Sequence, residues 1–379
     1  MCAKLVERVL DFTVEVPTVG QNGDGAAEVS SGQAWTDFCR ALEQAGEVIL
    51  RDTAPDTPLD RAEGYRYLTR LLREMLYTTV ENADPDFPRL HELDRVKLGA
   101  DNPDNVYLSA NIRGDRTYRI TGTRGSIAYF SIGSKANRYA IDGTMASTGE
   151  ISDRDLVVEP DGTVEIVASA TPHDKNWLPL APDSTGLVVR QTYLDRTTEV
   201  PGQWRIERIG DPIERKELDP AHLAKALATA AFSLHGTAAL FASWTEMFMT
   251  RPNEMPDFGQ EMFQKAGGDP EIFYLHGYWT LEPGQAWVIE TEVPDCPYWN
   301  FQLDNWWMES LDHERTITIN KHTATLDDGR LTIVVADKDP GWGNWIDTCG
   351  HTSGTALLRW LGADHHPLPE CKVIDLEAP

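Results

Sequence analysis

The spacing of apolar residues changes along the chain and separates helical stretches from β-rich stretches. Over residues 35–50, apolar side chains recur every three to four positions, as they do on one face of an amphipathic helix. The same spacing predicts a second helix over residues 60–81, with Asp60 as its N-cap. Residues 14–34 are rich in Gly and Ser and show little periodicity, which favours a loose arm. We therefore expect residues 1–99 to form an N-terminal arm followed by helices.

From residue 100 onward the pattern changes to short runs in which apolar and polar side chains alternate. This alternation is typical of half-buried β-strands, and Pro160-Asp161-Gly162 between two such runs is a hairpin signal. Asp219-Pro220 then begins a long apolar helix, with a capping Asp and a Pro at the first helical position. We expect β structure over residues 100–215, a helical connector over residues 216–267, and β structure again over residues 268–379.

The two β-rich blocks repeat the same landmarks at a nearly constant distance. Each landmark has a counterpart 167 to 169 residues later: Asp161-Gly162 and Asp328-Gly329, Asn176-Trp177 and Asn344-Trp345, and Arg190 and Arg359. This regularity indicates two copies of one unit, each a helical lead followed by an antiparallel β-sandwich; the alternative is that hairpins and Trp-anchored strands recur independently. The expected fold is therefore α+β, mainly β, with two tandem, internally duplicated β-sandwich units, each preceded by helices.

Three segments carry a family resemblance. The C-terminal block contains YWNFQLDNWWMESLDHERTITINKHTATL from Tyr298 and ADKDPGWGNWIDTCGHTSGTALLRW ending at Trp360, and Asp101–Tyr107 reads DNPDNVY. Together these segments resemble the bacterial domain of unknown function twelve-fourteen family, closely in the C-terminal third and more loosely over residues 100–210. The resemblance implies a β-sandwich of jelly-roll-like type and no settled activity.

The charge balance disfavours some classes of partner. Asp and Glu number 60 against 34 Lys and Arg, which gives a net charge of −26 at pH 7. Such a surface repels the phosphates of nucleic acids and of anionic membranes, so we expect neither as a partner. We identify no stretch near the roughly 20 apolar residues of a membrane span and no signal peptide at Met1–Leu10, which favours a cytoplasmic location.

The motifs of several large enzyme classes are missing from the sequence. There is no Gly-rich dinucleotide loop, P-loop, nucleophile elbow or His-Glu-x-x-His helix, so we expect no cofactor. A metal site built from His322, His351 and a carboxylate is an alternative, but we assign no metal ligands.

Two histidines near strand ends are the candidate catalytic residues. His322 ends one expected strand and His351 precedes another, and loops beside rigid sheets often present functional groups. Because imidazole exchanges protons near neutral pH, we assign His322 and His351 as acid and base. Asp347, or alternatively Glu309, would orient one imidazole, and Arg359 would hold an anionic group. The alternative is that both histidines only cap strand ends.

Tryptophans concentrate in the same region, and three of them are candidate walls of a binding pocket. Trp306, Trp307 and Trp345 lie within the 62 residues from Trp299 to Trp360. Trp often lines apolar sites, although these residues also suit a sandwich core. The hairpin between the two histidines is expected to return the chain, so that both lie at one end of the sheet beside Trp345 and Asp347.

These observations leave three functions open. The first is an enzyme that performs non-redox acid–base chemistry, hydrolysis or elimination, on a hydrophobic or aromatic small molecule. The second is a non-catalytic β-sandwich module that binds a small molecule or carbohydrate, and the third is a regulatory interaction protein. A homo-oligomer is compatible with each of them.

The cysteines give the first testable prediction. The sequence has five, without C-x-x-C spacing, as expected for reduced thiols: Cys2, Cys39, Cys296, Cys349 and Cys371. A thiol titration of the denatured, unreduced protein should therefore count five thiols. A count of three or one would mean that disulfides form, and it would contradict the expected cytoplasmic location.

Overall fold

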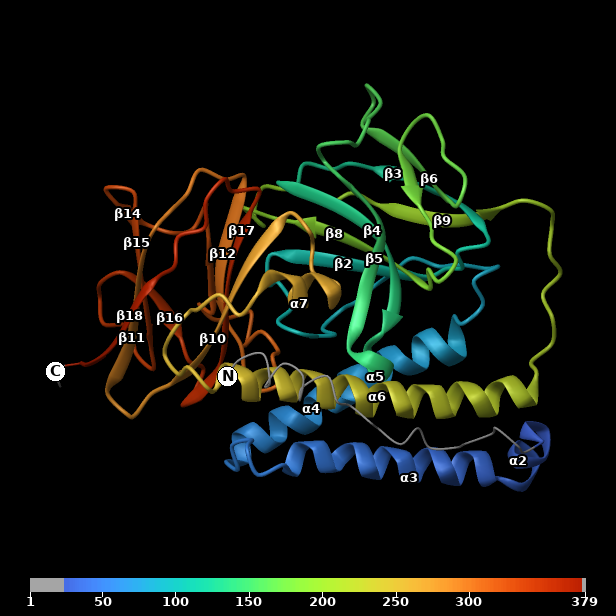
Figure 1. Cartoon of the computed structure of the whole chain (residues 1–379), viewed down its shortest axis with the longest axis horizontal. Coiled ribbons are helices and arrows are strands. Elements are labelled where there is room, and N and C mark those ends of the chain that lie inside the picture. Colours follow the sequence, from blue (N-terminus) through green and yellow to red (C-terminus); the bar gives the residue numbers. More distant parts are fainter. Residues whose placement is uncertain (1–23, 377–379) are drawn as a thin grey trace.

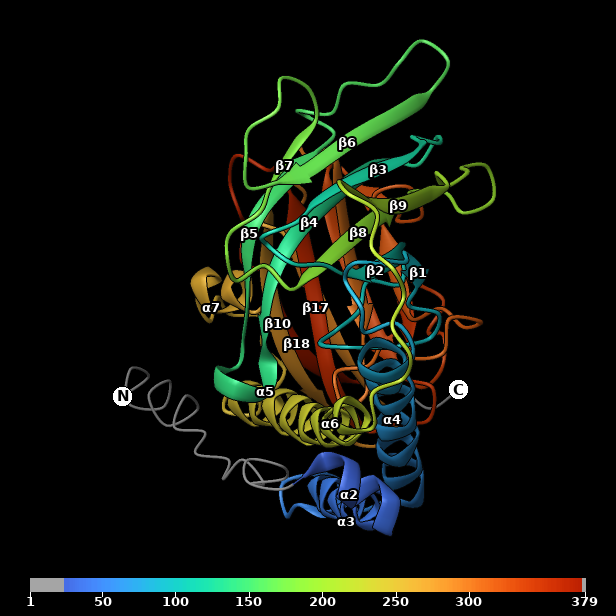
Figure 2. The same cartoon turned by 90° about the vertical axis from the view of Figure 1, so that its right-hand side faces the viewer.

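A layer of helices lies beneath two β units in the computed structural model, which describes residues 24–376 (Figure 1, Figure 2). The helices are α2 (Gly25–Ser31), α3 (Gln33–Glu47), α4 (Pro58–Leu76), α5 (Tyr139–Asp142), α6 (Pro220–Phe248) and α7 (Gln260–Lys265). A 3₁₀ turn, Val48–Leu50, extends α3, and a π-helical turn, Tyr77–Glu81, extends α4. The helices predicted over residues 35–50 and 60–81 are thereby confirmed.

The expectation of a loose arm over residues 14–34 is wrong for Gly25–Ser31, which form α2. The Asp24 carboxylate caps this helix by accepting a hydrogen bond of 3.1 Å from the Ala26 amide, and Gly32 ends it with a left-handed backbone. The earlier part of that arm lies outside the described residues. Short polar and Gly residues thus serve as helix caps here and do not mark a loop.

The N-cap of α4 is Thr57, and the assignment of Asp60 to that position is wrong. The Thr57 hydroxyl accepts a hydrogen bond of 3.1 Å from the Asp60 amide. One oxygen of the Asp60 carboxylate accepts a hydrogen bond of 2.5 Å from the Thr57 hydroxyl, which leaves the other oxygen available to another part of the chain.

The long helix α6 begins where the sequence predicts, with the Asp219 carboxylate accepting from the Ala221 amide. The expectation that no stretch is as long and apolar as a membrane span does not hold for α6, which qualifies by length and composition. Within the protein, 67% of its most apolar window is buried. Its apolar face packs against α4 and against the two β units, in one core cluster.

The first β unit consists of two facing sheets. One sheet runs in the order β7 (Trp177–Pro179), β6 (Thr163–Ser169), β3 (Thr117–Thr123) and β9 (Trp204–Ile209). The other sheet runs β1 (His91–Glu92), β2 (Asn105–Asn111), β8 (Gly186–Thr192), β4 (Tyr129–Arg138) and β5 (Thr144–Ser152). Apolar side chains between the two sheets form a separate core cluster.

The second β unit has the same construction. One sheet runs β10 (Ile272–Thr280), β17 (Ser353–Leu361), β12 (Tyr298–Leu303) and β13 (Thr318–Asn320). The other runs β14 (Leu326–Asp327), β15 (Arg330–Ala336), β11 (Gln285–Glu292) and β18 (Glu370–Asp375), and β16 (Asn344–Asp347) also pairs with β15. Its core cluster includes the buried indoles of Trp299 and Trp360.

The strand orders confirm the internal duplication. The order β2-β8-β4-β5 corresponds to β10-β17-β12-β13, and β7-β6-β3-β9 corresponds to β16-β15-β11-β18. Each unit also contains one parallel pair in an otherwise antiparallel arrangement, β6 with β7 and β15 with β16. The register agrees as well, because Arg190 lies opposite Tyr107 and Arg359 lies opposite Tyr274.

The two arginines join the units through reciprocal contacts, which we call the seam. The buried Arg359 guanidinium donates to the carbonyl of Ala100, which precedes β2 of the first unit. In the same way, Arg190 donates at 2.6 Å to the carbonyl of Gly267, which precedes the second unit. Each carbonyl belongs to the residue five positions before β2 or β10. Each unit therefore forms a hydrogen bond with the segment that precedes β2 or β10 of the other unit.

Tyrosines complete the seam with the same symmetry. The Asn102 amide donates to the Tyr107 hydroxyl at 3.0 Å, and the Asp269 amide donates to the Tyr274 hydroxyl at 2.7 Å. The Tyr298 hydroxyl contacts the Asn102 side chain at 3.2 Å, and the Tyr129 hydroxyl contacts the Asp269 carboxylate at 3.3 Å. Since these groups are buried, each bond also prevents the cost of an unpaired polar group.

Removal of the Arg359 guanidinium should destabilise the protein. Arg359→Met leaves the Ala100 carbonyl and the side-chain oxygens of Asn300 and Gln302 without their donor. We expect a loss of roughly 2–4 kcal/mol in the free energy of unfolding, measured by urea denaturation. The exposed Arg330 is the matched control, and Arg330→Met should change stability by less than about 0.5 kcal/mol. Equal effects of the two substitutions would contradict the role of Arg359.

Candidate functional site

The two candidate histidines lie at opposite ends of one sheet, so the expectation that they lie together is wrong. His322 follows β13, whose Asn320 pairs with Asn300, whereas His351 precedes β17, whose Ala356 pairs with Leu303 at the other end of β12. The physical reason is the parallel pairing of β15 with β16, which carries the chain to the far end instead of returning it. The His322 side chain is 56% exposed, with Asp195 as its ionic neighbour at 3.8 Å.

His351 has a carboxylate partner, but that partner is Asp60 and not Asp347. The His351 Nδ1 lies 2.9 Å from the Asp60 Oδ1, and both side chains are buried. Burial alone would raise the pKa of Asp60, but hydrogen bonds with His351 and Thr57 outweigh it and hold that pKa below its ordinary value. The Asp347 carboxylate instead pairs with Arg315 at 2.6 Å. The pair of His351 and Asp60 therefore fastens α4 to the second unit.

The remaining sequence candidates serve the core or the seam. Trp306 and Trp307 are buried in the cluster around α4 and α6, and the Trp307 indole donates to the Asp60 carbonyl at 3.1 Å. The half-buried Trp345 donates to the Ala336 carbonyl at 3.0 Å. Arg359 is fully engaged at the seam, and this geometry contradicts its expected role as an anion holder.

Glu309 belongs to a buried network of charges in the loop between β12 and β13. Arg70 of α4 donates to the Glu309 carboxylate at 2.6 Å, and burial raises the pKa of this carboxyl. Nearby, burial raises the pKa of Asp304 to about 7, and Lys97 donates to two backbone carbonyls of the same loop. In residues 24–376, no three His, Cys, Asp or Glu side chains are grouped as metal ligands would be.

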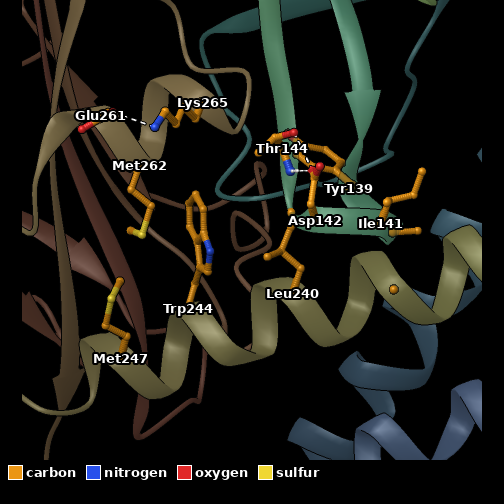
Figure 3. Close-up of a pocket in the computed structure, with 13 residues that line it drawn as sticks. Tyr139, Ile141, Asp142, Thr144, Leu240, Trp244, Met247, Glu261, Met262 and Lys265 are labelled. Carbon is orange, nitrogen blue, oxygen red and sulfur yellow. Dashed lines mark hydrogen bonds and ion pairs between the residues drawn. The ribbon is translucent and has the colours of Figure 1, made fainter. Parts of the chain in front are cut away.

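A pocket with a volume of about 180 Å³ lies elsewhere, between α5, α6 and α7 (Figure 3). Its walls are mostly apolar, and three charged side chains lie among them. The lining residues are Tyr139, Ala140, Ile141, Asp142, Gly143, Thr144, Gly236, Leu240, Trp244, Met247, Glu261, Met262 and Lys265. In Figure 3, α7 and α5 contribute opposite sides, and Trp244 and Leu240 of α6 lie between them.

Close contact between α5 and α6 sets the shape of this pocket. A Cβ atom at Gly236 would lie 2.7 Å from Ala140, so only glycine lets the two helices approach this closely. Gly143 ends α5 with a left-handed backbone at φ 74°. On the other side, Trp244 packs edge-on against Phe241 and Phe263, at centroid distances of 5.5 Å each. The indole is thus fixed as a wall.

The two copies differ at the position that this pocket occupies. The β4–β5 hairpin carries α5, and its counterpart between β12 and β13 is the loop over residues 304–317. In that loop Trp306, Trp307 and Met308 are fully buried and fill the corresponding space against α4. The candidate pocket therefore belongs to the first copy, whereas the sequence analysis placed the site in the second.

One feature of the sequence corresponds to the pocket: a stripe of residues along α6. Gly236, Leu240, Trp244 and Met247 follow one another at helical spacing and form a stripe along α6. Such a stripe cannot be distinguished from core by periodicity alone. In the structure these residues are largely buried and line the space between α5 and α7.

Comparisons with known proteins identify relatives but no activity. Residues 107–193 match a family model described as protein of unknown function (DUF1214), the family that the sequence motifs indicated. The match lies in the first β unit and not in the C-terminal third, where the resemblance was expected to be closest. No curated protein is significantly similar to the chain.

Two solved structures are similar over most of the chain. A crystal structure of an uncharacterized protein from Burkholderia cenocepacia has 46% sequence identity and a TM-score of 0.90, covering 92% of this chain and 99% of that one. The VPA0106 protein from Vibrio parahaemolyticus has 14% identity and a TM-score of 0.49, covering 83% and 98%. The first relative shares the whole architecture, including both β units.

The buried Asp304 predicts how stability depends on pH. Its pKa rises from 3.8 to about 7, first because of burial and also because of the nearby Asp101 charge. The folded protein therefore binds this proton more tightly than the unfolded chain, and stability falls as the pH rises through 7. Asp304→Asn keeps an acceptor for Gln302 and removes the charge, so it should stabilise the protein by roughly 1–3 kcal/mol at pH 8 and little at pH 4.

Urea denaturation at both pH values measures this difference. The exposed Asp328 provides the control, because Asp328→Asn should have nearly the same effect at pH 4 and pH 8. A stability gain of Asp304→Asn that is equal at the two pH values would contradict the raised pKa.

Proposed function

We propose a function from geometry alone, because the chain belongs to the DUF1214 family, whose description assigns no activity. In this proposal the protein binds a small hydrophobic or aromatic molecule in the pocket between α5, α6 and α7. The observation that carries the proposal is the apolar lining of that pocket by Leu240, Trp244, Met247 and Met262.

The size and position of the pocket support binding of a single-ring molecule. Its volume of about 180 Å³ is close to the roughly 150 Å³ of apolar cavities that accept benzene. Pockets for small molecules commonly lie where structural units meet. This one lies between α5 of the first unit, the long helix α6, and α7, which precedes the second unit. Met247 and Met262 add unbranched side chains that adapt to different shapes.

Binding without catalysis is favoured over the acid–base enzyme. Among the described residues, no histidine lines the pocket. Hydrogen bonds lower the pKa of both carboxyl groups in the lining, from Thr144 and Arg138 to Asp142 and from Lys265 to Glu261. A general base with a raised pKa, which hydrolysis or elimination would require near neutral pH, is therefore not available in the walls.

A pocket-filling substitution tests the proposal. Isothermal titration with 2-phenylethanol, a neutral single-ring probe, should give saturable binding with a dissociation constant on the order of 0.1–1 mM. Leu240→Trp places a large ring in the pocket and should weaken this binding at least about tenfold. The matched control is Leu326→Trp, at an exposed Leu on β14, which should leave binding unchanged.

Circular dichroism should show that both variants keep the parent fold. Equal affinities of the parent and of Leu240→Trp would contradict the proposed site.

A further inference from the structure

The charges around the pocket point to a more specific ligand, and this inference rests on the proposed function. We infer that the pocket takes a hydrophobic amine, a molecule with one flat apolar body and a protonated amino group. The argument combines the sign of the lining charges, the face of Trp244 and the charge of the whole protein.

Negative charge predominates among the lining side chains. Asp142, Glu261 and Lys265 are the charged members, two carboxylates against one ammonium. The pKa of Asp142 stays below its ordinary value because hydrogen bonds from Thr144 and Arg138 outweigh the effect of burial. The hydrogen bond from Lys265 lowers the pKa of Glu261. Both carboxylates are therefore ionised at neutral pH, one on each side of the pocket (Figure 3).

The cations that pair with these two carboxylates leave them able to bind a further cation. The Arg138 and Lys265 side chains are 51% and 62% exposed, and each pair joins residues four positions apart at the surface. Exposed pairs of this kind contribute little and are screened by salt, so an incoming ammonium group can share either carboxylate. A ligand carboxylate would instead approach a lining with a net negative charge.

Trp244 offers the ammonium group a second attraction. In Figure 3 its ring lies between Met262 and Leu240, with Glu261 on the α7 side and Asp142 on the α5 side. The face of an indole attracts cations, most strongly among the aromatic side chains. Leu240 and the two methionines provide apolar contact for the rest of the molecule. The net charge of −26 further raises the local concentration of cations around the protein.

Three probes with similar apolar bodies test the inference: 2-phenylethylamine, 2-phenylethanol and 3-phenylpropionate. In isothermal titration at low salt and pH 7, the amine should bind about five- to tenfold more tightly than the alcohol, and the propionate should bind most weakly. Raising the salt to 0.5 M should reduce the preference for the amine over the alcohol.

Charge-neutralising variants complete the test and act in opposite directions. Asp142→Asn, which keeps an acceptor for Thr144, should lower the preference for the amine severalfold. Lys265→Gln should raise the preference, because it removes the competing cation.

The outcomes separate the two proposals. If the alcohol binds as tightly as the amine, and Leu240→Trp blocks it, the pocket is a binding site but the inferred ligand class is wrong. If no probe binds, the proposed function fails and the inference fails with it. If the propionate binds most tightly, the assignment of charge is overturned.

Discussion

The structure depends on two buried guanidinium groups that hold the β units against each other. Arg190 and Arg359 occupy equivalent central strands, and each donates to a backbone carbonyl just before the other unit. A buried arginine without such acceptors would be costly, so the two units pack stably against each other only in an arrangement that keeps these hydrogen bonds. The two copies are therefore bound to one arrangement, in which the lead segment of each packs on the sheet of the other.

That arrangement creates two equivalent spaces. One lies between α5, α6 and α7, and the other lies between α4 and the loop over residues 304–317. The two copies use these spaces differently. Beside the second unit, the long loop after β12 fills the space with Trp306 and Trp307 and ties itself down through Arg70 and Glu309. Beside the first unit, α5 is only four residues long, and the space between it and α7 remains open. Duplication followed by divergence at one hairpin thus accounts for the difference between the two spaces.

Much of the fold could be predicted from the sequence because local signals and periodicity agree there. The start of α6 at Asp219-Pro220 matches the expected position, and constant offsets revealed the duplication. The site could not be predicted, because it depends on contacts between distant segments. Nothing near His351 in the sequence indicates Asp60 as its partner, and nothing near Trp306 indicates burial under α4. The parallel β15–β16 pair, which separates His322 from His351, is likewise a property of the sheet and not of local spacing.

The central claim is that the space between α5, α6 and α7 is a ligand site, and a crystal structure with 2-phenylethylamine at saturating concentration tests it most directly. The account predicts electron density for the ring beside Trp244, between Leu240 and Met262, with the amino group within reach of the Asp142 or Glu261 carboxylate. Density for the amine only at another place on the protein, with this pocket empty, would contradict the account.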